Sequence, residues 1–253
     1  MTKIVPELAR CAVCGKGNEV YNLASCSHFG SCDLDTRPSE TFPFTIFLQR
    51  CEHCGYVNTD ITVGHSSIKD FLNSEVYKTC DGIDPEVPEA RDFIQYALVQ
   101  SYMKVHTALF DFMDSDIEFS QENIFWGFLN AAWVCDDAAT HEPEEDEKIY
   151  DRELCRRNAI ECRKRCLDLI NTLIVKEQDQ DQRETLSGIK ADLLRRTAQF
   201  DAVIAEYENK IFRNPHVDQV IRFEMDLAKA RDVNRYSMDH IDAIKYPLKE
   251  KTE

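Results

Sequence analysis

Two copies of the pattern Cys-x-x-Cys-Gly constrain what this chain can fold into more than any other feature of its sequence. Thirty-six residues separate the first pair, Cys11 and Cys14, from the second, Cys51 and Cys54. Two residues between thiolates let both sulfurs face one ion, and the glycine after each pair permits the positive φ that such a turn needs. Four cysteine sulfurs form the closed tetrahedral set of structural zinc, with no position left for water. The sequence therefore predicts one structural zinc ion bound by Cys11, Cys14, Cys51 and Cys54; two redox-active pairs are the alternative.

The other cysteines do not suggest a disulfide framework. The chain has 11 cysteines, an odd number, and five of them lie in sequence with helical character. In a reducing compartment such cysteines pack as small apolar groups. The sequence also lacks a run of about 20 apolar residues that could span a membrane, and its start does not resemble a signal peptide. We therefore expect a cytoplasmic protein. The five cysteines are Cys80, Cys135, Cys155, Cys162 and Cys166.

The predicted fold is mainly α, in two domains. Residues 1–65 are expected to form a small zinc ribbon with two β-strands. Thr41–Leu48 is rich in β-branched and aromatic residues, and Gly55–Val63 alternates after the second cysteine pair. Residues 66–253 are expected to form an all-α domain of helical hairpins with short connections. The helices are predicted over 68–79, 88–113, 120–138, 144–175, 180–198, 200–212 and 216–234.

Two helical stripes are expected to face a core. Apolar residues recur at three- and four-residue steps from Phe125 to Trp133, through Phe128, Leu129 and Ala132. Cys155, Cys162 and Cys166 share one face of a later helix. A cofactor site at the aromatic stripe and a metal or redox site at the cysteines are the less favoured interpretations. The acidic run His141–Glu147 is interpreted as a solvated helix start or, alternatively, as a docking site for a basic partner.

A second group of candidate site residues lies between the cysteine pairs, in the stretch Cys26–Pro38. If residues 33–37 are extended, Asp33, Asp35 and Arg37 point to the same side. The favoured interpretation is an internal ion-pair network that fixes the loop onto the ribbon. The alternative is a site for a divalent cation or a polar ligand or partner, with His28 as a further candidate member. A second zinc site at Cys26, His28 and Cys32 is a further alternative.

The segment Phe29-Gly-Ser-Cys-Asp-Leu-Asp-Thr-Arg-Pro38, followed by Arg50-Cys51-x-x-Cys54-Gly-Tyr-Val57, resembles an uncharacterised family of bacterial proteins. Members of this family have an N-terminal Cys-x-x-Cys ribbon, a Phe-Gly-Ser-x-Asp-Leu-Asp-x-Arg-Pro segment and a helical tail. The resemblance covers about residues 10–60 and implies a fold and a site but no activity. Cysteine at positions 26 and 32 departs from the family pattern, which disfavours a second zinc site there.

Part of the C-terminal half resembles a tetratricopeptide repeat. Within Glu184–Val217, Ala191, Leu194, Ala198, Tyr207 and Pro215 occupy the small, large, small, aromatic and proline positions of that repeat. Residues 198–201 would form the turn between its two helices. Val203 and Lys210 stand where small residues are usual. A stable stack needs at least about three repeats, so a generic helical bundle explains the pattern almost as well.

The charge distribution disfavours nucleic acid as a partner. The net charge is −16, and residues 1–65, with five basic and seven acidic side chains, contribute −2 of it. Nucleic-acid binding takes most of its affinity from Lys and Arg. The sequence also lacks a Gly-rich phosphate loop, a nucleophile elbow and a His-Glu-x-x-His motif. We therefore expect a non-enzymatic protein that binds a protein or peptide partner; a ligand- or metal-dependent enzyme or sensor using Asp33, Asp35 and Arg37 is the alternative.

Overall fold

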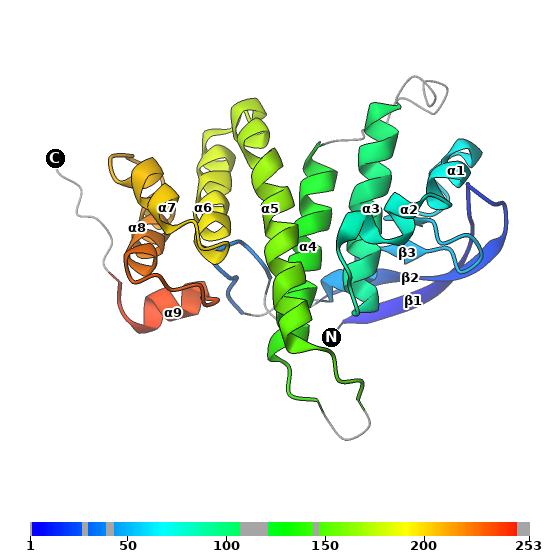
Figure 1. Cartoon of the computed structure of the whole chain (residues 1–253), viewed down its shortest axis with the longest axis horizontal. Coiled ribbons are helices and arrows are strands. Elements are labelled where there is room, and N and C mark those ends of the chain that lie inside the picture. Colours follow the sequence, from blue (N-terminus) through cyan, green and yellow to red (C-terminus); the bar gives the residue numbers. More distant parts are fainter. Residues whose placement is uncertain (1, 27–29, 39–42, 107–120, 144–146, 247–253) are drawn as a thin grey trace. The chain divides into compact units, whose positions relative to one another are not determined.

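The computed structural model describes residues 2–26, 30–38, 43–106, 121–143 and 147–246 (Figure 1). Within these ranges the chain is mainly α-helical, with two small two-stranded sheets in its N-terminal part, which confirms the predicted fold class. Its contacts divide it into two compact units. Unit 1 comprises Met1–Ser27 and Pro43–Cys162, and unit 2 comprises His28–Phe42 and Arg163–Glu253. The domain boundary expected between residues 65 and 66 stays a prediction.

Two antiparallel hairpins open unit 1, and each closes around one cysteine pair. Strand β1 (Lys3–Arg10) pairs with β2 (Gly17–Ser25), and β3 (Gln49–Arg50) pairs with β4 (Val57–Asn58). The sequence analysis did not predict β1 and β2. Their alternation is weak because β1 has no buried residue and β2 buries only Asn18 and Val20, while Leu8 and Tyr21 are exposed.

The strand predicted over Thr41–Leu48 is wrong where the structure describes it. Residues 41 and 42 lie outside the described ranges, and Phe44–Phe47 form a 3₁₀ helix, η1. The ring of Phe44 packs against Phe93 and Trp133, with ring centroids 5.9 and 5.7 Å away. Packing on helices therefore overrides the β propensity of this aromatic stretch. The strand predicted over Gly55–Val63 is reduced to β4, because a turn follows it.

Unit 1 continues with short helical turns and then two long helices. Instead of one helix over 68–79, the chain forms η2 (Ser66–Ile68), α1 (Lys69–Leu72), α2 (Glu75–Lys78) and η3 (Cys80–Gly82). Ser74 breaks the predicted helix because its backbone is extended and its hydroxyl caps α2. The long helices are α3 (Pro88–Val105) and α4 (Gln121–Thr140). The predicted extension of α3 beyond residue 106 lies outside the described residues.

Helices α3 and α4 pack side by side at close range (Figure 1). At Gly127 of α4, an added Cβ would lie 2.9 Å from the Cβ of Ala97 and 3.1 Å from the carbonyl oxygen of Phe93. The predicted aromatic stripe faces this core: Phe125, Phe128, Leu129, Ala132 and Trp133 are all buried. That prediction is confirmed.

Helix α5 (Arg152–Lys176) begins eight residues later than predicted. Residues 144–146 lie outside the described ranges, residues 147–151 are not helical, and Asp151 accepts hydrogen bonds from the amides of Glu153 and Leu154. Glu147, the last residue of the acidic run, is therefore not in the first turn of this helix. The predicted burial of Cys155, Cys162 and Cys166 is confirmed.

The later helices of unit 2 are α6 (Gln180–Arg196), α7 (Phe200–Tyr207), α8 (Pro215–Lys229) and α9 (Met238–Ala243). Ala198, with φ of 60°, lies in the turn between α6 and α7, and Asn214 caps α8. Helices α7 and α8 end five residues earlier than predicted, and α9 was not predicted. The core of these helices contains Ala191, Leu194, Phe200, Val203, Tyr207, Ile221 and Ala228. None of the described helices combines the length and apolarity needed to cross a membrane.

Candidate metal centre

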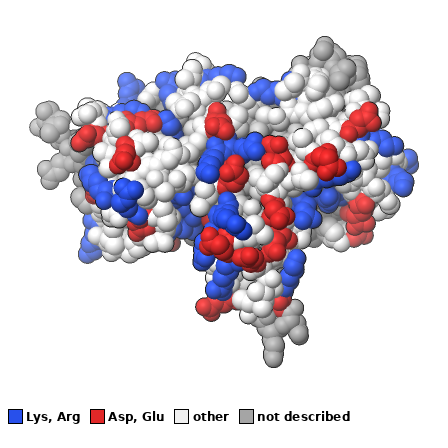
Figure 2. All heavy atoms as spheres, viewed as in Figure 1, with Lys and Arg blue, Asp and Glu red and all other residues white. Residues whose placement is uncertain are grey.

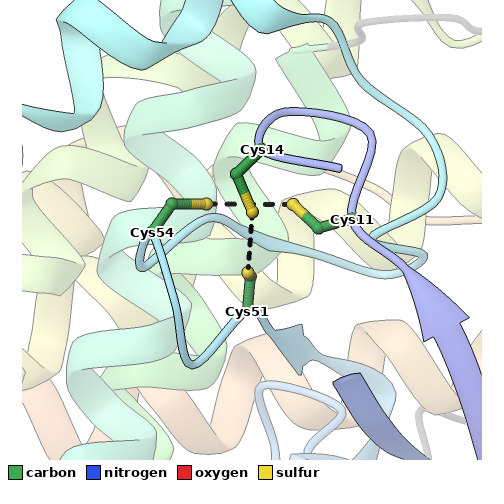
Figure 3. Close-up of side chains that lie close together, drawn as sticks. All are labelled: Cys11, Cys14, Cys51 and Cys54. Carbon is green, nitrogen blue, oxygen red and sulfur yellow. Dashed lines mark hydrogen bonds between the residues drawn. The ribbon is translucent and has the colours of Figure 1, made fainter. Parts of the chain in front are cut away.

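The two cysteine pairs meet in unit 1 and form one cluster. Figure 3 shows the sulfurs of Cys11, Cys14, Cys51 and Cys54 pointing toward one another. All four Sγ atoms lie within 4.8 Å of one another. Among the residues that the structure describes, this is the group of cysteines, histidines and acids that is placed to share a metal ion.

The two turns that present these cysteines have the same geometry. The carbonyl oxygen of Cys11 accepts a hydrogen bond from the amide of Gly15, and that of Cys51 from the amide of Gly55, both at 2.8 Å. Both glycines have φ of +74°, a conformation that L residues other than glycine rarely adopt. The repeated Cys-x-x-Cys-Gly pattern therefore produces a repeated backbone turn.

The sulfur positions fit a tetrahedral metal ion. The Sγ atoms of Cys11 and Cys54 are 3.8 Å apart, and those of Cys14 and Cys51 are 3.6 Å apart. Four thiolates at about 2.3 Å from a zinc ion would be separated by about 3.8 Å along each edge of the tetrahedron. A disulfide would need about 2.05 Å. The cluster therefore has the dimensions of a metal site with four cysteine ligands.

The cysteines of the cluster are buried to different degrees, and burial changes the pKa values of their thiols. Cys11 and Cys51 are 1% and 0% exposed. Burial raises the pKa values of Cys11 and Cys54. Burial also acts to raise the pKa of Cys51, but hydrogen bonds from the backbone amides of Cys54 and His53 outweigh it and lower that pKa to about 7. A divalent cation at the centre would favour the thiolate form of all four groups.

The second turn is anchored to the helices of unit 1. Arg50, directly before Cys51, donates from Nη1 to Asp92 Oδ1 at 2.6 Å and to Gln95 Oε1 at 2.7 Å. Tyr77 donates its hydroxyl proton to the carbonyl oxygen of Gly55 at 2.5 Å. These contacts orient the turn from α2 and α3. The sequence analysis missed them, because nothing in the local pattern shows which helix residues face the turn.

Further hydrogen bonds join the first turn to the second. The amide of Ala12 donates to the carbonyl oxygen of Ile61 at 2.9 Å, and the amide of Glu52 donates to Asn18 Oδ1 at 3.0 Å. His53 is exposed, with Nε2 3.2 Å from the carbonyl oxygen of Gly17. Hydrogen bonds between the two hairpins therefore help to bring the two cysteine pairs together.

The second group of candidate site residues, Asp33, Asp35 and Arg37, belongs to unit 2, and the backbone there is not extended. Thr36 has φ of 68°, and the amide of Asp33 donates to the carbonyl oxygen of Arg37 at 2.9 Å, which closes a tight turn. Asp35 and Arg37 are 1% and 2% exposed, and Leu34 is buried as well. The premise that residues 33–37 are extended is therefore wrong. His28 lies outside the described residues, so the site proposed with it and the alternative zinc site at Cys26, His28 and Cys32 stay predictions.

Asp33 and Asp35 lie among charged side chains of the unit 2 helices. Arg235 donates from Nε to Asp33 Oδ2 at 2.6 Å. Burial, followed by the proximity of Asp192, raises the pKa of Asp35 to about 6 against the opposing effect of Arg163 and Arg196. The ion pair with Arg235 joins this segment to unit 2, and the hypothesis of an ion-pair network that fixes the loop onto the ribbon stays a prediction.

A fully buried ion cluster lies next to these residues. Arg195 of α6 donates from Nη2 to Asp192 Oδ1 at 2.8 Å and from Nε to Glu224 of α8. The side chains of Arg195 and Glu224 are 0% exposed. Burial, then the neighbouring Asp192, raises the pKa of Glu224 to about 8 despite its contact with Arg195. The sequence analysis did not identify this cluster.

Comparison of the chain with protein-family models, curated proteins and solved structures gives no match. The class of protein is therefore defined by its own fold and site: a mainly α-helical protein with a small N-terminal β part that carries a candidate metal centre of four cysteines.

Proposed function

We propose that the chain is a zinc-binding interaction protein, in which one structural zinc ion stabilises the N-terminal β hairpins and the helical part binds a protein or peptide. The observation that supports the zinc ion is the spacing of the four sulfurs, which corresponds to a closed tetrahedral set without a position for substrate or water. This kind of centre stabilises a fold and does not catalyse a reaction. The likeness to the uncharacterised bacterial ribbon family agrees with the proposal but adds no activity to it.

Two further features support an interaction role in the cytoplasm. No disulfide joins the cysteines that the structure describes, as expected of a reducing compartment. On the face drawn in Figure 2, acidic and basic side chains are interspersed, and no broad basic stripe is visible. That pattern suits a protein partner better than a nucleic-acid backbone. Asp35 and Arg37 are too deeply buried to meet a solute, which weighs against the enzyme or sensor alternative.

Elemental analysis of the purified chain tests the zinc assignment. We expect about one zinc ion per chain, and cobalt substitution should give the absorption bands of a tetrahedral thiolate site. Replacing one ligand, Cys51→Ser, should abolish tight binding, whereas Cys135→Ala, which changes a buried cysteine outside the cluster, should leave the zinc content unchanged. Less than about half an equivalent of metal in the reduced chain would reject the assignment.

Affinity capture with the full chain as bait tests the interaction role. Proteins that are enriched by the wild-type chain should be identified by mass spectrometry and confirmed by binding of the purified pair. Failure of every enriched protein to bind in purified form would contradict the interaction role while leaving the zinc assignment intact.

A further inference from the structure

Residues 31–37 lie against a surface of unit 2 that is far away in the sequence. We call residues 31–37 the docked segment. The surface that receives it, the acceptor surface, consists of Val220, Phe223, Leu227, Arg235, Tyr236 and Ile241. Helices α8 and α9 and the chain between them supply these residues. The ion pair between Asp33 and Arg235 spans 202 residues of sequence.

Backbone hydrogen bonds hold the docked segment in a strand-like pairing. The amide of Leu34 donates to the carbonyl oxygen of Tyr236 at 3.1 Å, and the amide of Met238 donates to that of Cys32 at 2.9 Å. Asp33 and Ser237 form an antiparallel β-bridge between these bonds. The pairing is a single bridge at residues 32–34, and the docked segment then turns through residues 33–37.

Side chains add an apolar anchor and a charge contact to this pairing. Leu34 is 4% exposed and belongs to a buried cluster with Val220, Phe223, Leu227 and Ile241. One residue before it, Asp33 forms the 2.6 Å ion pair with Arg235. An anchor in an apolar pocket beside a charge pair is the usual means by which a short peptide is bound selectively.

We propose that the acceptor surface also binds, in trans, a peptide of another protein with the same chemistry, a leucine between two aspartates, and that residues 31–37 are an internal ligand that competes for it. The inference rests on the proposed interaction function and specifies its surface and partner class. The contacts described above all lie within seven consecutive residues, so a free peptide can reproduce them. The docked segment is tethered to its own surface and therefore has a high effective concentration, which a partner must overcome.

The backbone of Thr36 gives an incoming peptide a way to compete. Its φ of 68° lies in the left-handed region, which is unfavourable for a residue other than glycine. Glycine adopts this conformation readily. A peptide with glycine at that position therefore avoids a cost that the docked segment bears.

The test uses a fluorescent peptide of residues 31–38 with the change Cys32→Ser, titrated with the full chain. The Leu34→Asp variant of the chain places a carboxylate in the apolar pocket and should release its own docked segment. We expect this variant to bind the peptide at least about ten-fold more tightly than the wild-type chain does. A Thr36→Gly peptide should bind several-fold more tightly still, and a Leu34→Ala peptide should lose binding. Circular dichroism verifies that the variant is folded; if it is not, Asp33→Ala, which removes only the ion pair with Arg235, replaces it.

Equal affinity of the folded variant for the native and Leu34→Ala peptides, or failure to bind the native peptide, would overturn the inference. A wild-type dimer that the Leu34→Asp change abolishes would assign the acceptor surface to a second copy of the chain and would also overturn it. A captured partner that stays bound in saturating peptide would refute the inference but not the interaction role. Peptide binding by the variant, with no partner confirmed by affinity capture, would support the inference about the acceptor surface but contradict the interaction role.

Discussion

At the scale of single residues, the cysteine cluster and the ion cluster around Arg195 differ in how their charges are compensated. The cysteine cluster gathers four groups that repel one another as thiolates and needs a cation to compensate for them. In the cluster around Arg195, Asp192 and Glu224 accept hydrogen bonds from the guanidinium group. Because both clusters are buried, the protonation of each is tied to folding.

The buried carboxyl groups of unit 2 make its stability fall as the pH rises. The pKa of Glu224 is raised to about 8 and that of Asp35 to about 6, in both cases chiefly by burial. The folded state therefore favours the protonated forms. The stabilisation is complete below the pKa values of the unfolded chain, near 4, and is lost as the pH passes through about 6 and then about 8.

Urea unfolding at several pH values should therefore give a lower free energy of unfolding at pH 8.5 than at pH 5. The change Glu224→Gln keeps a neutral side chain of the same shape and should remove most of this slope. Glu206→Gln is the control: burial acts to raise the pKa of Glu206, but ion pairs with Lys190 and Lys210 outweigh it and lower that pKa. Its contribution changes below pH 5, so the slope above pH 5 should persist. A wild-type slope that Glu224→Gln leaves intact would contradict this explanation.

At the scale of helices and strands, glycine positions distinguish close packing from open space. Gly127 of α4 lies where an added Cβ would meet the backbone of α3 at 3.1 Å, whereas the nearest atom to such a Cβ at Gly188 of α6 is 4.0 Å away. Neither glycine has positive φ. Both glycines therefore lie in helical backbone, but only Gly188 has space for an added methyl group.

The pair of substitutions Gly127→Ala and Gly188→Ala should change stability in opposite directions. At Gly127 the added methyl group forces α3 and α4 apart, and we expect a loss of about 1–3 kcal/mol. At Gly188 alanine improves the helix propensity and should stabilise by about 0.5–1 kcal/mol. Chemical denaturation monitored by circular dichroism measures both changes. Equal effects at the two positions would contradict the close approach of α3 and α4.

At the scale of the whole molecule, the described metal-ligand set belongs to unit 1 alone. The turns that bear the ligands are bonded to β2, α2 and α3 in the same unit. The helices α6, α7 and α8 have their own apolar core in unit 2. The two units should therefore respond differently to loss of the metal.

Removal of zinc by a chelator should expose the amides of Gly15 and Gly55 to hydrogen exchange, because the turns that contain them lose the ion that fixes the cysteines. The amides within α6 and α8 should keep their protection. Hydrogen exchange followed by mass spectrometry, with and without chelator, measures both regions, and the Cys51→Ser chain should reproduce the chelated pattern. Equal loss of protection in α8 would show that the metal stabilises unit 2 as well.

The sequence by itself determined the four cysteines of the candidate metal centre, the fold class and most of the long helices. Cys-x-x-Cys-Gly fixes a local turn, and a 3.6-residue apolar period fixes a helix, so neither depends on distant parts of the chain. Only the tertiary structure decided that residues 44–47 are helical, that Asp33 pairs with Arg235, and that Arg195 is buried with Glu224. The physical reason is that these outcomes are set by burial and by counter-charges contributed from elsewhere in the chain, and no local pattern records which residues will supply them.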